Sequence, residues 1–125
     1  MITVSLPRHT IISANRNLHY HVKANMARQL RSQAFWIAKA AKETYPGPVD
    51  MIITFSWPPT ARRRDRMNLS LTIKHLVDGM VDAGVILDDN DKIIRSEHLV
   101  TADEPCQDAY GVVLDFEFHP IEVAA

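Results

Sequence analysis

Apolar and polar residues alternate along four stretches of the chain. This pattern predicts β-strands, because successive side chains of a strand point to opposite faces of a sheet. The predicted strands are MITVSLP (1–7), VDMIITFSW (49–57), KIIRSEHLVT (92–101) and YGVVLDFEFH (110–119). Two further stretches repeat their apolar residues at helical spacing and predict helices over 23–43 and 68–83, and the first helix is expected to begin near Leu18 to Lys23.

The ends of both helices carry recognisable signals. The first helix is followed by YPGP at 45–48, where proline and glycine stop a helix. Asp65 or Asn68 is a candidate N-cap for the second helix, and Gly84 lies just past its C-terminus, where glycine is favoured. These signals support the two helix boundaries.

The order of elements predicts the fold class. Strand, helix, strand, helix, strand, strand is typical of an α/β (α+β) domain built on a mixed sheet. The 125 residues suffice for one hydrophobic core, and we find no repeat or interdomain linker, so residues 1–125 are expected to form a single domain.

Composition indicates the class of protein and the cellular compartment to expect. Hydrophobic residues make up 46% of the chain and charged residues 23%, which is ordinary for a globular protein. Cys106 is the single cysteine, which rules out an internal disulfide framework and a cysteine-based zinc site. We see no signal peptide and no apolar run near the roughly 20 residues of a membrane span. A cytoplasmic location is therefore expected.

Charge is distributed unevenly along the chain. Residues 1–64 hold ten Lys or Arg and two acids, a formal +8, and residues 65–125 hold four against thirteen, a formal −9, which together give the net −1. Such asymmetry indicates a basic surface for a polyanion beside an acidic cluster for a cation. Mutual pairing of the opposite charges in the folded chain explains it equally well.

Acids and bases concentrate in RRRDRMNLSLTIKHLVDGMVDAGVILDDND, residues 62–91. Asp65 follows three arginines, and three more aspartates lie after the second helix. Magnesium needs only one or two protein carboxylates to support phosphodiester hydrolysis, so these residues are candidate metal ligands. The candidate set is Asp65, Asp88, Asp89 and Asp91. The ordinary alternative is a helix cap, a solvated turn and surface arginines.

Other chemistries find less support. An EF-hand loop counted from Asp89 has Ile94 where glycine is required. His19 and His21 are two residues apart and the other histidines are scattered, while the four glycines do not form a phosphate loop. No nucleophile elbow is present.

The stretch 62–91 resembles the RusA family of Holliday-junction resolvases, which is common in phages and prophages. The resemblance rests on RRRD at 62–65, Asn68, Lys74, VDGM at 77–80, AG at 83–84 and the pair Asp88–Asp89. The strand before this stretch and the basic loop near 14–21 also match the family's layout. The resemblance covers most of the chain and is most specific over these thirty residues.

The resemblance implies a homodimeric, magnesium-dependent endonuclease that nicks two opposed strands of a four-way DNA junction. It also implies that the cytoplasm is that of a bacterium or a phage-infected host. Asp65 and Asp89 would be catalytic, with Asp88 beside Asp89, and the helix lysine would be Lys74. We expect Mg²⁺ as the cofactor, with Mn²⁺ as a substitute. The residues expected to contact DNA are Arg62, Arg63, Arg64, Arg16, Asn15 and Lys23.

Two departures from the family pattern bear on the site. Met67 stands where the family has a second aspartate, and the spacing from Asn68 to Lys74 is longer by about one helical turn. Asp91, or Asp78 on the helix, is a candidate replacement for the missing carboxylate. A straight helix over 68–83 is about 24 Å long, so Asp65 and Asp89 share a metal only if the acidic turn folds back or a second subunit completes the site.

Three functions follow from these patterns. The first is a structure-selective DNA endonuclease, with basic residues on phosphates and Tyr20 as a candidate for base stacking. The second is a catalytically weak or silent junction-binding protein, which Met67 favours. The third is an unrelated small-molecule enzyme or interaction module, since small α/β domains host many functions.

Overall fold

The computed structural model describes residues 1–12, 18–61, 65–107 and 111–122. Its strands are β1 (Ile2–Pro7), β2 (Val49–Ser56), β3 (Ile94–Thr101) and β4 (Gly111–Pro120). Its helices are α1 (Tyr20–Ala41) and α2 (Ser70–Asp82), with short 3₁₀ turns η1 (Arg8–Thr10) and η2 (Arg66–Leu69). The predicted α/β class and element order are therefore confirmed.

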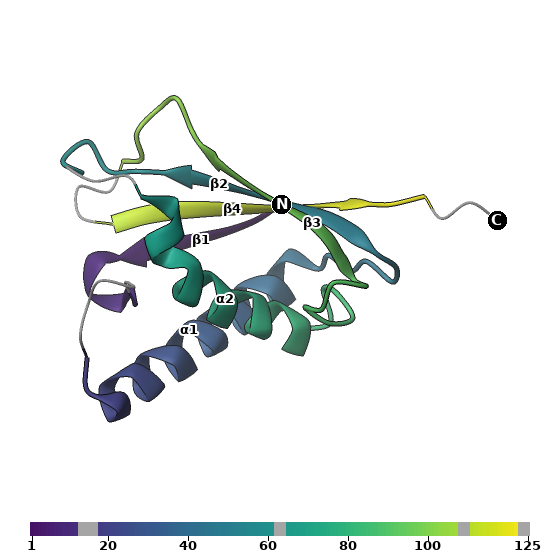
Figure 1. Ribbon diagram of the computed structural model, residues 1–125, viewed down its shortest axis with the longest axis horizontal. Helices are drawn as coiled ribbons and strands as arrows, with labels where there is room; N and C mark the ends of the chain where they lie inside the picture. Colours follow the sequence, from purple (N-terminus) through teal and green to yellow (C-terminus); the bar gives the residue numbers. More distant parts are fainter. Residues whose placement is uncertain (13–17, 62–64, 108–110, 123–125) are drawn as a thin grey trace.

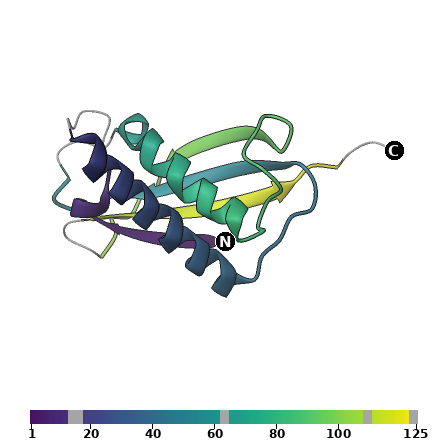
Figure 2. The ribbon, with the colours of Figure 1, turned by 90° about the horizontal axis from the view of Figure 1, so that it is seen from below.

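The four strands form one mixed sheet in the order β1-β4-β2-β3. β4 lies antiparallel between β1 and β2, while β3 runs parallel to β2. The parallel pair is joined through α2, because a parallel connection needs a crossover rather than a hairpin. Both helices cover the same face of this sheet (Figures 1 and 2).

Alternation along the strands assigns the two faces of the sheet. In β2, Val49, Met51, Ile53 and Phe55 are buried against the helices, and the residues between them are only partly covered. β4 repeats this pattern, and its described residues confirm the predicted inward face from position 112 to 118. Each fully buried side chain of this size stabilises the fold by roughly 1.5–3 kcal/mol relative to exposure.

The first turns of the two helices compare differently with the prediction. α1 begins at Tyr20, within the predicted range of 18 to 23, where the His19 side chain caps it by accepting from the His21 N–H at 3.3 Å. The second predicted helix begins as the 3₁₀ turn η2, whose N-cap is Asp65, and becomes α-helical at Ser70. The predicted cap at Asp65 is thus present.

α1 and α2 pack closely where Gly79 meets α1. A Cβ atom at this position would lie 2.2 Å from the Arg31 carbonyl oxygen and 2.8 Å from the Ala34 Cβ. Beside this contact the Arg31 guanidinium pairs with both carboxylate oxygens of Asp82, at 2.5 and 2.9 Å. The helix pair is therefore fixed by one close backbone approach and one bidentate ion pair.

Gly79→Ala is expected to destabilise the protein by about 1–3 kcal/mol, because overpacking outweighs the roughly 1 kcal/mol gain in helix propensity. Urea unfolding measures the difference. Gly47→Ala is the matched control, since a Cβ there meets no atom within 4 Å, and its expected effect is within about 0.5 kcal/mol. A Gly79→Ala protein as stable as the control variant would contradict the close approach.

Candidate functional site

The chain reverses direction immediately after α2. The Gly84 N–H donates to the Val81 carbonyl at 2.9 Å and the Val85 N–H donates to the Met80 carbonyl at 3.0 Å. These two bonds, with Gly84 at φ 83°, form a Schellman motif, which glycine accommodates because it has no Cβ. Val85 and Ile86 are then buried in the core. The predicted helix end at Gly84 is present, and the segment that follows is held against the domain.

The acidic turn, residues 88–91, is organised by its own side chains. Asp88 accepts from the Asp89 N–H at 2.8 Å and from the Asn90 side-chain amide at 3.1 Å. Asn90 accepts from the backbone N–H groups of Lys92 and Ile93. Asp88 and Asn90 therefore fix the turn and aim Asp89 at α2.

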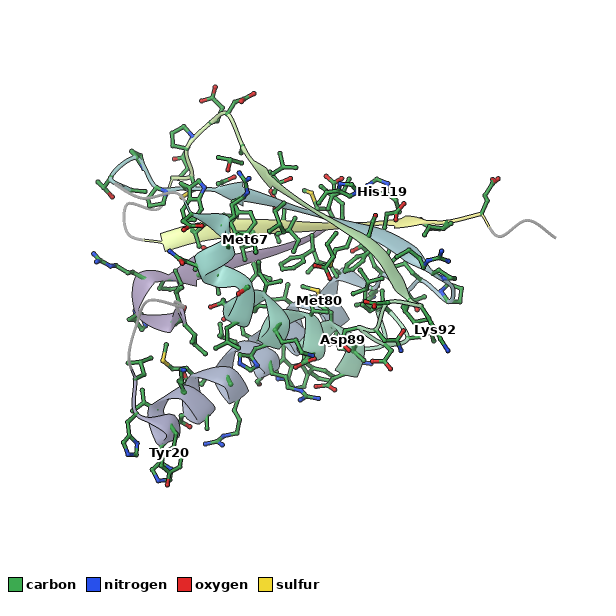
Figure 3. The ribbon with its side chains drawn as sticks, viewed as in Figure 1. Tyr20, Met67, Met80, Asp89, Lys92 and His119 are labelled. Atoms are coloured by element: carbon green, nitrogen blue, oxygen red, sulfur yellow. The ribbon has the colours of Figure 1, made fainter. Side chains whose placement is uncertain are left out.

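Asp89 reaches the middle of α2. Its carboxylate hydrogen bonds to the Lys74 ammonium, fifteen residues earlier in the chain, and the same ammonium donates to Asp78 at 2.8 Å. Lys74 is exposed and the two carboxylates are half-buried. We call Lys74, Asp78 and Asp89 the Lys74 cluster; it lies where the acidic turn meets α2, and Figure 3 labels Asp89 there.

Ion pairing shifts the pKa values within the Lys74 cluster. The hydrogen bonds that Lys74 donates to Asp78 and Asp89 raise the pKa of Lys74, and the bond that Asp89 accepts from Lys74 lowers the pKa of Asp89. Because the pKa of Asp89 is lowered in the folded protein, its ionised form stabilises the fold at pH values above the ordinary pKa near 3.8. This stabilisation is lost as the pH falls through the folded-state pKa. Because the pKa of Lys74 is raised in the folded protein, its ammonium form stabilises the fold at pH values below 10.5. This stabilisation is lost as the pH rises through the folded-state pKa. Lys74 and Asp89 are therefore both charged at neutral pH.

Asp65 lies outside the Lys74 cluster. It is exposed, and its carboxylate accepts from the Met67 N–H at 3.1 Å as the cap of η2. Helical rise alone separates Asp65 from Lys74 by about 15 Å. Figure 3 likewise labels Met67 and Asp89 toward opposite ends of α2. The turn thus folds back as one of the two predicted routes requires, but it returns to Lys74 rather than to Asp65.

The four predicted ligands do not form one group in a single chain. Over the described ranges, no three His, Cys, Asp or Glu side chains are placed together to hold a metal ion. Asp91 is exposed on the turn. Completion of the site by a second subunit stays a prediction, as does the ligand role of Asp65.

The predicted DNA-contacting residues fall mostly outside the described ranges. These are Arg62, Arg63, Arg64, Asn15 and Arg16. Lys23 is exposed in the first turns of α1. Ile12, the last described residue before the segment 13–17, is tied to the buried Thr72 of α2 by two hydrogen bonds of 2.9 Å. The chain therefore enters the predicted DNA-binding segment beside α2, two residues from Lys74.

The Lys74 cluster has the donor chemistry that magnesium requires. Magnesium takes oxygen ligands, keeps several waters, and is held by one or two carboxylates together with substrate phosphate oxygens. Asp78 and Asp89 converge on one ammonium, so their oxygens already surround a single cation. Asp78, a candidate replacement for the carboxylate lost at Met67, is the one that the structure places beside Asp89.

Several contacts of charged residues were not predicted from the sequence. The Lys74–Asp78 pair has the i, i+4 spacing that signals a helical ion pair, and that spacing was a usable clue. The Arg31–Asp82 pair joins residues fifty-one apart and left no local signal. On the sheet face away from the helices, Ser96 bonds to Asp50 and to His98, a contact that depends on the register of β2 and β3.

The chain matches no protein-family model, and no similar sequence is found among curated proteins. In the described part of the chain, no helix has the length and apolar character needed to cross a membrane.

Lys74→Met is expected to raise the pKa of Asp89, because the hydrogen bond from the ammonium is the largest cause of its lowered value. Carboxyl-carbon NMR titration measures this change. Lys92→Met is the matched control: Lys92 is exposed, three residues from Asp89, and it contributes nothing to the Asp89 shift. Equal shifts in the two variants would mean that overall charge, not the Lys74 contact, sets the pKa of Asp89.

Proposed function

We propose that this protein is a structure-selective DNA endonuclease that resolves four-way junctions by magnesium-dependent phosphodiester hydrolysis. One observation carries the proposal: the acidic turn folds back so that Asp89 and Asp78 converge on Lys74 at the solvent-facing side of α2. The likeness of residues 62–91 to RusA-type resolvases supports it, since the same lysine and aspartate were expected to be catalytic.

The residues of the cluster have distinct roles in this proposal. Asp89 and Asp78 would hold the magnesium ion, which supplies a polarised phosphoryl oxygen and a bound water of lowered pKa. Lys74 would stabilise negative charge on the phosphate held beside it. Asp88 fixes the turn that aims Asp89, and Asp65 would join the site from a second copy of the chain.

The arginines at 62–64 would bind the phosphates that flank the cleaved bond. Arg66 donates to Thr101 at 2.7 Å and so ties η2 to the end of β3. η2 begins two residues after Arg64 in the sequence, so this bond fixes the described segment that follows the arginines. A homodimer would present two such sites, as the nicking of two opposed strands requires.

Asp89→Asn is expected to lower the nicking of a labelled four-way junction in magnesium by about 100-fold or more, because a carboxylate that holds the metal is worth several kcal/mol. Binding to the junction should persist. Asp103→Asn, at an exposed acid of the loop after β3, is the matched control and should nick at the wild-type rate. Equal activity of the Asp89 and Asp103 variants would remove Asp89 from the chemistry.

Asp65→Asn tests the second catalytic residue without loss of the helix cap. Asparagine caps about as well as aspartate, so the free energy of unfolding should change by no more than about 0.5 kcal/mol. Nicking should fall by about 100-fold if Asp65 holds the metal. Mixing this variant with Asp89→Asn measures completion in trans, because one of the two sites in a mixed dimer would then regain both aspartates. Wild-type nicking by Asp65→Asn would restrict Asp65 to its capping role.

A catalytically silent junction binder is the second candidate. Met67 is 67% exposed at the position where a carboxylate was expected, and a thioether does not bind magnesium. This candidate predicts salt-dependent binding to the junction with no nicking in magnesium or manganese. The same gel separates the two functions, because binding and strand cleavage are scored on one labelled substrate.

A further inference from the structure

α1 is a helix without acids. Its 22 residues include Lys23, Arg28, Arg31 and Lys39 and not one Asp or Glu. Arg31 is neutralised by Asp82 of α2. The remaining cations have no acidic neighbour on their own helix, so the outer side of α1 is positively charged.

Arg28 and Lys39 lie on one line along that outer side. They are eleven positions apart in the sequence, which is about three helical turns and about 16 Å of rise. Both are exposed, whereas Leu30, Ala34 and Ala38 are buried on the opposite side. Figure 2 shows α1 running across the helical layer, in front of the sheet. The two charges therefore point into solvent along the length of the helix.

Trp36 lies between these cations on the exposed side of the helix. Its side chain is 66% exposed, whereas Trp57 is 9% exposed. Its ring meets Phe35 edge-on at 5.0 Å, and the Lys39 ammonium lies 5.7 Å from the Phe35 ring. Most of the indole is thus exposed to solvent, next to a phenyl ring that a cation contacts. We call Arg28, Trp36 and Lys39 the α1 stripe.

The side chains of the α1 stripe are partly ordered before any partner binds. Arg28 donates to the Asn25 side chain at 3.1 Å, one turn earlier on the helix. Lys39 is restrained by its contact with Phe35. Restraint of this kind lowers the side-chain entropy lost on binding.

We infer that the α1 stripe binds a nucleic-acid strand with unpaired bases, with phosphates on Arg28 and Lys39 and a base stacked on Trp36. The inference rests on the proposed function for its choice of polyanion. An unbranched duplex keeps its bases stacked inside, whereas bases at a branch point or in a single strand offer a free face to an exposed indole. Positive charge that follows the backbone together with a stacking aromatic is the combination by which proteins bind single strands.

Intrinsic fluorescence reads the stacking directly, because Trp36 is the exposed tryptophan and Trp57 is buried. Titration with an oligothymidylate of about 12 nucleotides, within the usual site sizes for single strands, should quench the emission. Trp36→Phe should remove the quenching while retaining binding, and Trp36→Leu should weaken binding about 10-fold, within the range for loss of one stacked base. Quenching that persists in Trp36→Phe would overturn the inference.

The charges are tested by salt dependence. Arg28→Gln with Lys39→Gln should reduce the slope of log K against log salt by about 1.4, which corresponds to two phosphate contacts on a single strand. Lys92→Gln with Arg95→Gln is the control, since it removes the same charge from two exposed residues near the acidic turn and β3. Equal slopes in the two double variants would overturn the inference, as would the absence of oligonucleotide binding by the wild-type protein.

The four-way junction separates this inference from the proposed function. If the wild-type protein nicks junctions and the stripe variants bind and nick as it does, the stripe is excluded and the endonuclease stands. If the oligonucleotide quenches Trp36 but no junction is nicked, the stripe stands and the endonuclease fails. Binding to an unbranched duplex should depend on salt through Arg28 and Lys39 but should not quench Trp36 fluorescence, because a duplex offers no unpaired base.

Discussion

The return of the chain after α2 is the constraint on which the candidate site depends. A helix separates the residues at its two ends in proportion to its length, so the acidic turn would lie far from the middle of α2 if the chain continued outward. The Schellman motif at Gly84 turns the backbone, and burial of Val85 and Ile86 holds it there. The Tyr45 N–H also donates to the Val85 carbonyl at 2.7 Å, which ties the turn to the segment before β2. Asp89 meets Lys74 because these contacts leave the acidic turn beside α2.

The same packing converts a charge gradient in the sequence into two adjacent surfaces. The basic first half of the chain contributes α1, and the acidic second half contributes α2 and the turn that follows it. Gly79 lets the helices approach, and Arg31 pairs with Asp82 across the contact. Between the two helices, the Arg31–Asp82 pair is the ion pair that neutralises opposite charges. Mutual pairing of the two halves' charges therefore accounts for Arg31 and Asp82. It does not account for Arg28 and Lys39, which are exposed to solvent.

Local patterns in the sequence were sufficient to predict the elements but not their contacts. Strands followed from alternation because one face of each is buried, and the cap at Asp65 followed from short-range backbone chemistry. The placement of β4 between β1 and β2 depends on pairings between residues far apart, such as Ile2 with Phe116, for which a single sequence holds no local signal. The Asp89–Lys74 contact is of the same kind. The first turn of the second helix differed because Asp65 caps a 3₁₀ turn, a distinction that apolar spacing does not make.

The carboxylates of Asp78 and Asp89 lie close together in the Lys74 cluster, and such an arrangement requires a cation between them. Two carboxylates that converge repel each other, and here the ammonium of Lys74 offsets that repulsion while it lowers the pKa of Asp89. Because Lys74 is half-exposed, water screens the pair, and its net contribution to folding is small, on the order of 0–1 kcal/mol. A weakly held ammonium is one that a divalent ion can displace at little cost to the fold. The same lysine would then be free to meet a phosphate, so the contacts that stabilise the acidic turn and the chemistry proposed for it require the same three side chains.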